Sequence, residues 1–253
     1  MPHTQHAIIL AAGFGSRLQA QEGHKLLAVV GGRTLLAWHL DHFTSLGVTH
    51  VTVVTGFRHE ALERAVLEAS LDADLQVHTA YNPKFDGSNG LSVLAGVERA
   101  RAQFPEQTYP FWLTMADHVF DPKLGAHILE VFDPAPNTQG ALFVDAKLDS
   151  IYDMPDATKV LTREGILQDI GKEIEAFNLV DVGLFWCTPG FVEALDDALA
   201  QRGDCSTSDA VTSLSALGAF EFPDIGEHLW QDVDTPGARA HAEKLMTSWK
   251  QSR

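Results

Sequence analysis

The first stretch that could do chemistry is a glycine-bearing loop directly after a short apolar run. Residues 7–12, AIILAA, lead into Gly13-Phe14-Gly15-Ser16-Arg17, and Lys25 follows. Glycines after a strand let the backbone turn tightly and bring its N–H groups close to a polyphosphate. Arg17 can bind phosphate oxygens in a bidentate way, and Lys25 supplies a compact point charge. The alternative is an ordinary strand-to-helix turn with two solvated cations.

Two common phosphate-binding loops do not match this stretch. A P-loop would close on Gly-Lys-Ser or Gly-Lys-Thr, and the sequence has no such closure here. A dinucleotide-binding Gly-x-Gly-x-x-Gly would need a third glycine, but Leu18 and Gln19 occupy that part of the loop. The residues alone therefore indicate a phosphate loop of another type.

Carboxylates form the second candidate group. Asp117 follows the apolar run 110–116, PFWLTMA, and so lies at the strand end where open α/β sheets bind ligands. Mg²⁺ takes oxygen donors beside substrate phosphates, which makes Asp117 a candidate metal ligand. In the run 229–234, LWQDVD, alternation places Asp232 and Asp234 on one side. Asp234 could alternatively cap the last helix.

The elements that must position these groups alternate in type along the chain. Strands are predicted at 7–12, 50–55, 75–80, 110–116, 138–145, 178–187, 221–224 and 229–234. Helices are predicted at 34–46, 58–69, 91–103, 121–132, 188–201 (capped by Thr188), 204–217 (capped by Thr207 or Ser208) and 236–249. Hairpins are predicted over 146–171, with a turn at Glu164-Gly165. This order predicts a doubly wound α/β sheet in a single domain, with a hairpin-rich lobe at about 146–180.

Composition limits the classes of function. A formal net charge of −16 disfavours a nucleic-acid-binding surface, so a site for anionic nucleotides needs local positive charge. The two cysteines, Cys187 and Cys205, have no CxxC spacing, which favours a reduced, cytoplasmic setting. We expect no signal peptide and no stable membrane insertion, because no apolar run approaches membrane-spanning length. The oligomeric state stays open.

Several motifs resemble one known family in the same order along the whole chain. The pattern L-A-A-G-x-G-x-R…K resembles the signature of the sugar-nucleotidyltransferase superfamily, the MobA-like NTP transferases. Within it, the chain is most similar to CTP-dependent L-myo-inositol-1-phosphate cytidylyltransferases, and phosphocholine and 2-aminoethylphosphonate cytidylyltransferases share related motifs. The matching segments are LAAGFGSR, Lys25, SNGLS, TMADHVF, ATKV, IGKEIEAFNLVDVGLF and LWQDVDTP. The resemblance implies a Rossmann-like, GT-A-type fold.

The resemblance also implies roles for individual residues. Nucleotide binding falls on the signature loop (Leu10, Ala11, Ala12, Gly13, Phe14, Gly15, Ser16 and Arg17), on Lys25, and on a base-reading loop (Gly87, Ser88 and Asn89). The metal aspartates fall on Asp117 and Asp234, with Asp232 as an alternative ligand. The lysines that hold the acceptor phosphate fall on Lys159 and Lys172. The sequence departs from the family pattern at His24, which precedes Lys25, and at Val182, which follows Asp181.

Some of these positions also have simpler explanations. Residues 87–89 could form only a turn and a helix cap, and His118 could be a structural residue at a strand end. A lysine on a hairpin, such as Lys159 or Lys172, is usually solvated.

The reaction implied is attack by an acceptor phosphate oxygen on the α-phosphorus of CTP, with pyrophosphate leaving and Mg²⁺ assisting. The nucleophile is already anionic, so positioning and charge neutralisation suffice. Two alternatives stay open at this point: uridylyl or guanylyl transfer to another sugar phosphate or to a cofactor precursor, and a nucleotide-sensing or scaffolding domain without activity. The joint presence of Arg17, Lys25, Asp117 and Asp234 speaks against the second.

Overall fold

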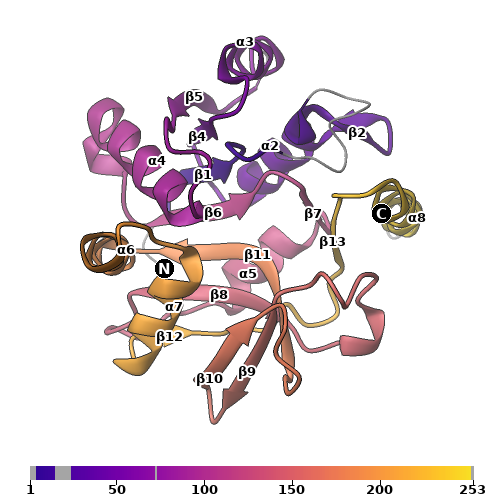
Figure 1. The fold of residues 1–253 in the computed structure, drawn as a ribbon. Coiled ribbons are helices and arrows are strands. Elements are labelled where there is room, and N and C mark those ends of the chain that lie inside the picture. The colour runs from indigo at the N-terminus through magenta and orange to yellow at the C-terminus, as the bar shows by residue number, and fades with distance from the viewer. Residues whose placement is uncertain (1–3, 15–23, 72, 252–253) are drawn as a thin grey trace.

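The chain folds around one large β-sheet (Figure 1). The structure, a computed structural model, describes residues 4–14, 24–71 and 73–251. Gly15, Ser16 and Arg17 of the predicted phosphate loop lie outside the described residues. Among the helices that are described, none is both long enough and apolar enough to span a bilayer.

The large sheet combines a parallel part with an antiparallel part. Its strand order is β10-β9-β11-β6-β1-β4-β5, and β8 pairs with both β11 and β12. The pairs of β1 with β4 and β6, and of β4 with β5, are parallel, whereas β11 runs antiparallel to β6, β8 and β9. The strands are β1 (His6–Leu10), β4 (His50–Thr55), β5 (Gln76–Tyr81), β6 (Phe111–Met115), β8 (Gly140–Asp145), β9 (Lys159–Arg163), β10 (Ile166–Gly171), β11 (Leu179–Cys187) and β12 (Phe220–Glu221).

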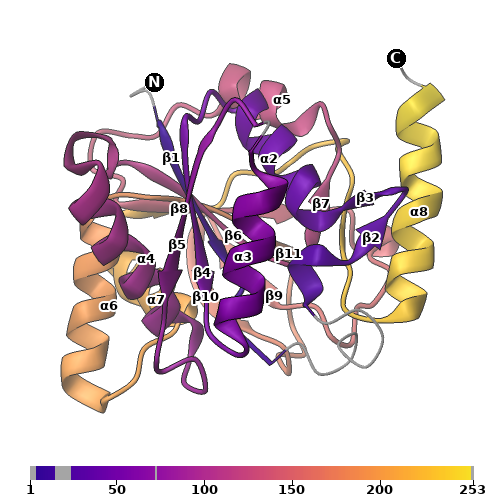
Figure 2. The same ribbon diagram turned by 90° about the horizontal axis from the view of Figure 1, so that it is seen from above.

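Helices cover both faces of this sheet. Alternate residues of the buried strand β1 point to opposite faces, so Ala7 and Ile9 join one core while Ile8 and Leu10 join the other. The first core includes residues of α2 (Leu35–Ser45), α3 (His59–Ala69) and α5 (Leu124–Val131). The second includes residues of α4 (Asn89–Gln103), α6 (Pro189–Arg202) and α7 (Thr207–Ala216). Figure 2 shows α2 and α3 on one side of the sheet and α4, α6 and α7 on the other, which confirms the predicted doubly wound α/β fold.

The predicted lobe contains one hairpin rather than two. The antiparallel pair β9–β10 extends the sheet at the bottom of Figure 1, and its turn lies at Glu164-Gly165, where both residues have positive φ. Residues 146–158 form a short 3-10 helix, η3 (Leu148–Ser150), and turns instead. The hairpin expected there was therefore wrong, because this irregular segment has no partner strand.

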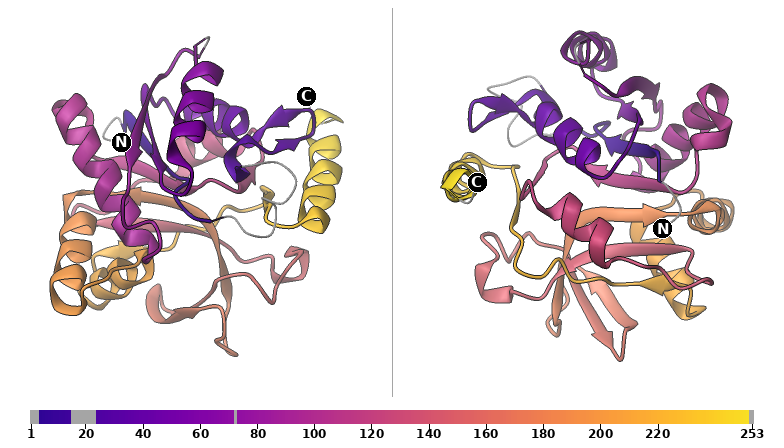
Figure 3. Two further views of the ribbon diagram at one scale, coloured as in Figure 1. Left: turned by 45° about the horizontal axis from the view of Figure 1, so that its top comes forward. Right: turned by 180° about the vertical axis from the view of Figure 1, so that it is seen from behind.

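Two small sheets and the last helix complete the described fold. β7 (His118–Phe120) pairs with β13 (Trp230–Asp232), and β2 (Val29–Val30) pairs with β3 (Arg33–Thr34). Helix α8 (Pro236–Gln251) lies beside the β2–β3 hairpin (Figure 3) and shares a third core with it. Short 3-10 turns are η1 (Lys25–Leu27) and η2 (Pro105–Gln107). The β7–β13 pairing places His118 opposite Asp232.

Helix caps test the local predictions. Thr188 caps α6 as predicted, since its side chain accepts a hydrogen bond from the Gly190 N–H. The predicted caps of α7, Thr207 or Ser208, were wrong, because Ser206 forms a reciprocal capping box with Asp209. The sequence offered Asp234 as an alternative cap of the last helix, α8. In the structure a capping bond there is made by Thr235, whose hydroxyl accepts from the Ala238 N–H.

Candidate active site

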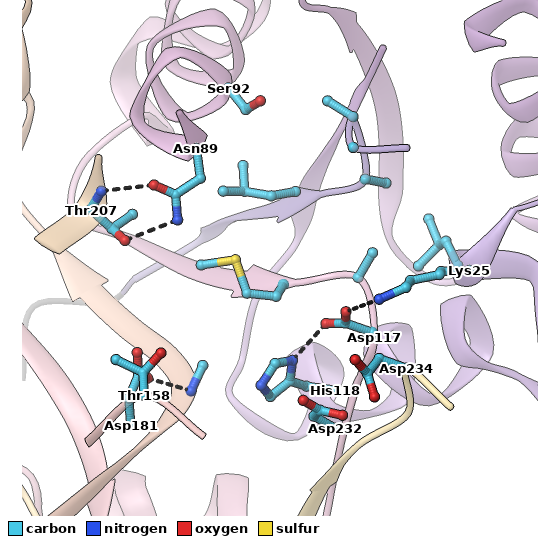
Figure 4. Close-up of a pocket in the computed structure, with 18 of the residues that line it drawn as sticks. Lys25, Asn89, Ser92, Asp117, His118, Thr158, Asp181, Thr207, Asp232 and Asp234 are labelled. Atoms are coloured by element: carbon cyan, nitrogen blue, oxygen red, sulfur yellow. Dashed lines mark hydrogen bonds and ion pairs between the residues drawn. The ribbon is translucent and has the colours of Figure 1, made fainter. Parts of the chain in front are cut away.

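The carboxyl ends of β1 and β6 open into a cavity of about 420 Å³ (Figure 4). The residues that line it are spread along the chain from Leu10 to Asp234. The predicted residues among them are Leu10, Ala11, Ala12, Gly13, Lys25, Gly87, Asn89, Asp117, Lys172, Asp232 and Asp234. Those not singled out as site residues from the sequence include Ser92, Asp156, Thr158, Asp181, Gly183, Thr207, Ser208 and Trp230. This is the edge at which open α/β sheets bind ligands.

Asp117 stands at one end of the cavity between Lys25 and His118. Its Oδ2 accepts a hydrogen bond from Lys25 Nζ at 2.8 Å, and its Oδ1 lies 2.9 Å from His118 Nδ1. Burial by itself would raise the pKa of Asp117, but the hydrogen bond and charge of His118 and the ion pair with Lys25 outweigh it. The pKa of Asp117 is therefore held well below its usual range, and the carboxylate stays ionised.

His118 is fixed by an aromatic neighbour and by a glycine. Its ring stacks on Trp230 with an interplanar angle of 3° and a centroid distance of 5.6 Å. The other face needs Gly183, whose φ is +72° and where a Cβ would lie 2.5 Å from His118 Nε2. Burial would lower the pKa of His118, yet the carboxylates of Asp117, Asp232 and Asp181 raise it. The carboxylates around His118 thus favour the protonated form of its imidazole.

Three carboxylates converge beside Asp117. Oxygen atoms of Asp156, Asp232 and Asp234 all lie within 4.8 Å of one another, and Asp234 is only 3% exposed. Burial raises the pKa of Asp232 to about 6, and the negative charges of Asp117 and Asp234 add to the effect. A set of oxygen donors that repel one another in this way fits a hard divalent cation. Asp156 was not predicted, because it lies in the irregular segment before β9.

The other end of the cavity is lined by neutral polar groups. Asn89 lies at the start of α4, and Thr207 at the start of α7. The two residues are joined by two hydrogen bonds, which Figure 4 draws as dashed lines. Ser92 lines the same end from the next turn of α4. The predicted base-reading loop therefore meets a helix that the sequence did not connect with it.

Residues of the lobe at about 146–180 line a third side of the cavity. Lys172 Nζ forms an ion pair with Asp156 Oδ1 at 2.8 Å, and Thr158 and Asp181 lie close by in the lining. Burial raises the pKa of Asp181 to about 6, although the Gly183 N–H and His118 oppose this shift. Asp181 Oδ1 accepts that Gly183 N–H at 2.7 Å.

Three residues that were predicted to contact substrate make contacts with other parts of the protein in the structure. Lys159 is 8% exposed and does not line the cavity. Its ammonium donates to the Lys172 and Ala157 carbonyl oxygens. Ser88 donates its hydroxyl to Asp204 Oδ2 at 2.6 Å rather than lining the cavity. Phe14 is 49% exposed and packs on Phe57 and Phe85, with ring centroids 5.3 and 5.4 Å away.

Comparison with curated proteins finds relatives along nearly the whole chain. A "Bifunctional IPC transferase and DIPP synthase" from Rubrobacter xylanophilus is 30% identical over 97% of this chain and 53% of its own length. A protein of the same name from Aquifex aeolicus is 26% identical over 95% of this chain and 51% of its own. The chain spans about half of the length of these curated relatives.

Solved structures agree on the fold. A structure of the inositol-1-phosphate CTP transferase from T. maritima superposes with a TM-score of 0.81 at 23% identity, covering 98% of this chain and 97% of that one. A putative glucose-1-phosphate thymidylyltransferase from Bacillus anthracis gives a TM-score of 0.77 at 14% identity, covering 95% and 94%. Residues 7–149 match the MobA-like NTP transferase domain. The chain belongs to the MobA-like NTP transferase family.

Proposed function

We propose that this MobA-like NTP transferase joins CTP to L-myo-inositol 1-phosphate, giving CDP-inositol and pyrophosphate. The observation that carries the proposal is the cavity itself, where the loop after β1, the Lys25–Asp117 pair, the aspartates near α8 and the start of α4 meet. The names of the full-length relatives, an IPC transferase, and of the similar structure, an inositol-1-phosphate CTP transferase, support this substrate pair. We propose residues 1–253 as one nucleotidyltransferase domain, with the lobe at about 146–180 facing the acceptor.

The phosphates of CTP would lie at the end of β1. Backbone groups from Leu10 to Gly13 line this part of the cavity, and Lys25 supplies a cation beside them. Gly15, Ser16 and Arg17 are proposed to complete the phosphate loop. Asp117 orients the Lys25 ammonium through the 2.8 Å ion pair. This end of the cavity therefore combines a glycine-bearing loop with a fixed positive charge.

A divalent cation, proposed to be Mg²⁺, fits the carboxylates on the same side. Asp232 and Asp234, together with Asp156, have ligand atoms close enough to share one ion, and Asp117 is proposed as a further ligand. When bound, such an ion neutralises phosphate charge and stabilises the departing pyrophosphate. We expect Asp234→Asn to abolish turnover for this reason.

The acceptor would approach from the lobe. One oxygen of its phosphate attacks the α-phosphorus, a new P–O bond forms, and the bond between the α-phosphorus and the bridging oxygen of pyrophosphate breaks. Lys172 is proposed to hold the acceptor phosphate, and Lys159 to support it by binding the Lys172 carbonyl. Asp181 and Thr158 offer hydrogen-bond partners for hydroxyl groups. This polar lining fits a polyhydroxylated acceptor.

A substrate panel tests the proposal. Purified protein is incubated with Mg²⁺ and with CTP, UTP, GTP or ATP, each paired with inositol 1-phosphate, phosphocholine or glucose 1-phosphate, and pyrophosphate release is followed. We expect the highest specificity constant for CTP with inositol 1-phosphate. Pyrophosphate release that is fastest with another pair would replace the proposed substrates, and no release with any pair would overturn the assignment as an active enzyme.

A further inference from the structure

The starts of α4 and α7 are locked together at the cavity wall. The Ser88 N–H and hydroxyl both donate to the Asp204 carboxylate, at 3.1 and 2.6 Å. Two residues on, the Gly90 N–H donates to the Cys205 carbonyl at 3.0 Å. A Cβ on Gly90 would lie 2.5 Å from that carbonyl oxygen, so the two backbones can meet only at a glycine. These contacts hold the two helix starts in one fixed arrangement.

Between these contacts, Thr207 sets the orientation of the Asn89 side chain. The Thr207 N–H donates to Asn89 Oδ1 at 2.9 Å, and Asn89 Nδ2 donates to Thr207 Oγ1 at 3.0 Å. A backbone N–H can only donate, so the atom opposite it must be the amide oxygen. The amide could not be flipped without placing N–H against N–H. In Figure 4 the Asn89 oxygen is turned toward the Thr207 backbone.

This pairing decides which hydrogen-bonding groups are left for a ligand. Asn89 Nδ2 has a second hydrogen that no other described residue accepts. The hydroxyls of Thr207 and Ser92 already accept from Asn89 and Asn82, and their own hydrogens have no acceptor among the described residues. Thr207 and Ser92 are 5% and 6% exposed, so these groups are held in the wall. This end of the cavity therefore presents hydrogen-bond donors.

We infer that Thr207 is a specificity-determining residue, which selects cytosine over uracil by fixing Asn89 as a donor. The inference rests on the proposed function, since it requires that the base of the nucleotide occupy this end. Cytosine presents two adjacent acceptors, N3 and O2, whereas uracil has an N–H at position 3. A donor from Asn89 pairs with cytosine N3 but meets the N–H of uracil. Such a mismatch leaves a buried donor unpaired and lowers the relative efficiency about ten- to a hundred-fold.

Substitutions on both sides of the pair test this inference. In Asn89→Asp, the carboxylate still accepts from the Thr207 N–H but presents an acceptor to the cavity. Asp is also well tolerated in the first turn of a helix. We expect the ratio of kcat/KM for CTP to that for UTP to fall about ten- to a hundred-fold. Thr207→Val keeps the N–H that binds Oδ1 but removes the hydroxyl that holds Nδ2 in place. The amide can then turn about its one remaining bond, so the same ratio should fall, whereas Thr207→Ser keeps the hydroxyl and should keep the wild-type ratio.

The ratio separates a specificity role from a purely structural one, because general damage lowers both specificity constants together. Circular dichroism and thermal unfolding establish that each variant folds, and Thr207→Ala serves as the second variant if Thr207→Val does not. A ratio within two-fold of wild type in folded Thr207→Val or Thr207→Ala, or in Asn89→Asp, overturns the inference. A wild-type protein that does not use CTP overturns the proposed function instead, so the two failures are distinguishable.

Discussion

The two lobe lysines should give opposite results when each is replaced by methionine, which removes the charge but keeps the chain length. Lys172 is exposed, lines the cavity and pairs with Asp156 at 2.8 Å. Lys159 is buried; its ammonium donates to the carbonyls of Lys172 and Ala157 and lies 5.9 Å above the Phe177 ring. The first lysine can therefore contact a substrate, whereas the second holds the segment that carries the first.

The expected magnitudes follow from these surroundings. Removing the buried ammonium of Lys159 deletes a charged hydrogen-bond donor, which costs about 1.5–3 kcal/mol of unfolding free energy and lowers Tm by about 3–12 °C. The exposed Lys172–Asp156 pair is worth only about 0–1 kcal/mol. Loss of a charge-assisted contact to the acceptor phosphate should instead raise the acceptor KM about ten- to a hundred-fold in Lys172→Met.

Thermal unfolding and steady-state kinetics with both substrates varied measure the two effects. Lys244→Met, on an exposed position of α8, is the matched control and should change neither. In Lys172→Met we expect a nearly normal Tm and nearly normal CTP parameters. The reasoning would be refuted by an unchanged acceptor KM in Lys172→Met, or by a Lys159→Met variant of wild-type stability with the same kinetic defect as Lys172→Met.

Three further predictions concern the site and the core. Asp117→Asn should lower turnover at least about a hundred-fold, because Lys25 and His118 lose the charge that orients them. Asp133→Asn, at an exposed position, is the control and should behave as wild type. Equal turnover in the two variants would contradict this prediction. Gly183→Ala should lower kcat up to about a hundred-fold, since its Cβ would displace the His118 ring, and a wild-type kcat in the folded variant would argue against that constraint. Burial lowers the pKa of His42 to about 3 in the folded protein, from 6.5 in the unfolded chain. Below pH 6.5 the unfolded chain therefore binds the proton that the folded protein excludes, and the free energy of unfolding falls by about 2 kcal/mol at pH 5. Urea unfolding at pH 7.5 and 5.0 should show a smaller pH effect in His42→Phe than in wild type, and an equal effect would refute it.

Much of the fold follows from local patterns that the sequence displays. The apolar run 7–12 becomes the buried strand β1, and HVTVVT becomes β4, because continuous apolar runs of this length fit a parallel sheet covered on both faces. Thr188-Pro189 begins α6 because threonine is a good cap and proline fits the first turn. The strands β7 and β13 have three residues each. β13 lies inside the predicted strand 229–234, whereas β7 was not predicted, because it forms only by pairing with β13 across the chain.

The same limit explains which site residues were found. Asp117 follows an apolar run, and the strand pattern alone places it at the sheet edge. For Asp232 the alternation gives only a shared side with Asp234. Asp156 lies in turns without periodicity, and Thr207 meets Asn89 across a long sequence separation. One signal was present but unused: a glycine after an acid inside a strand, Asp181-Val182-Gly183, is typical of a bulge. The register of β11 does shift between Asp181 and Phe185.

The two ends of the cavity differ in the interactions that they offer a ligand, and this difference fits a nucleotide, which has one neutral and one highly charged end. At the end proposed for the base, Asn89 and Thr207 are neutral and rely on the direction of hydrogen bonds, which salt screens little. At the end proposed for the phosphates, charged and titratable groups are dense: Lys25 and His118 lie against Asp117, and three further carboxylates converge there. Carboxylates outnumber cations there among the described residues, so a polyphosphate would be repelled unless a divalent cation joined it. The proposed divalent cation would let a chain of net charge −16 bind an anionic substrate, because the excess acid at this end would hold the cation that the substrate requires.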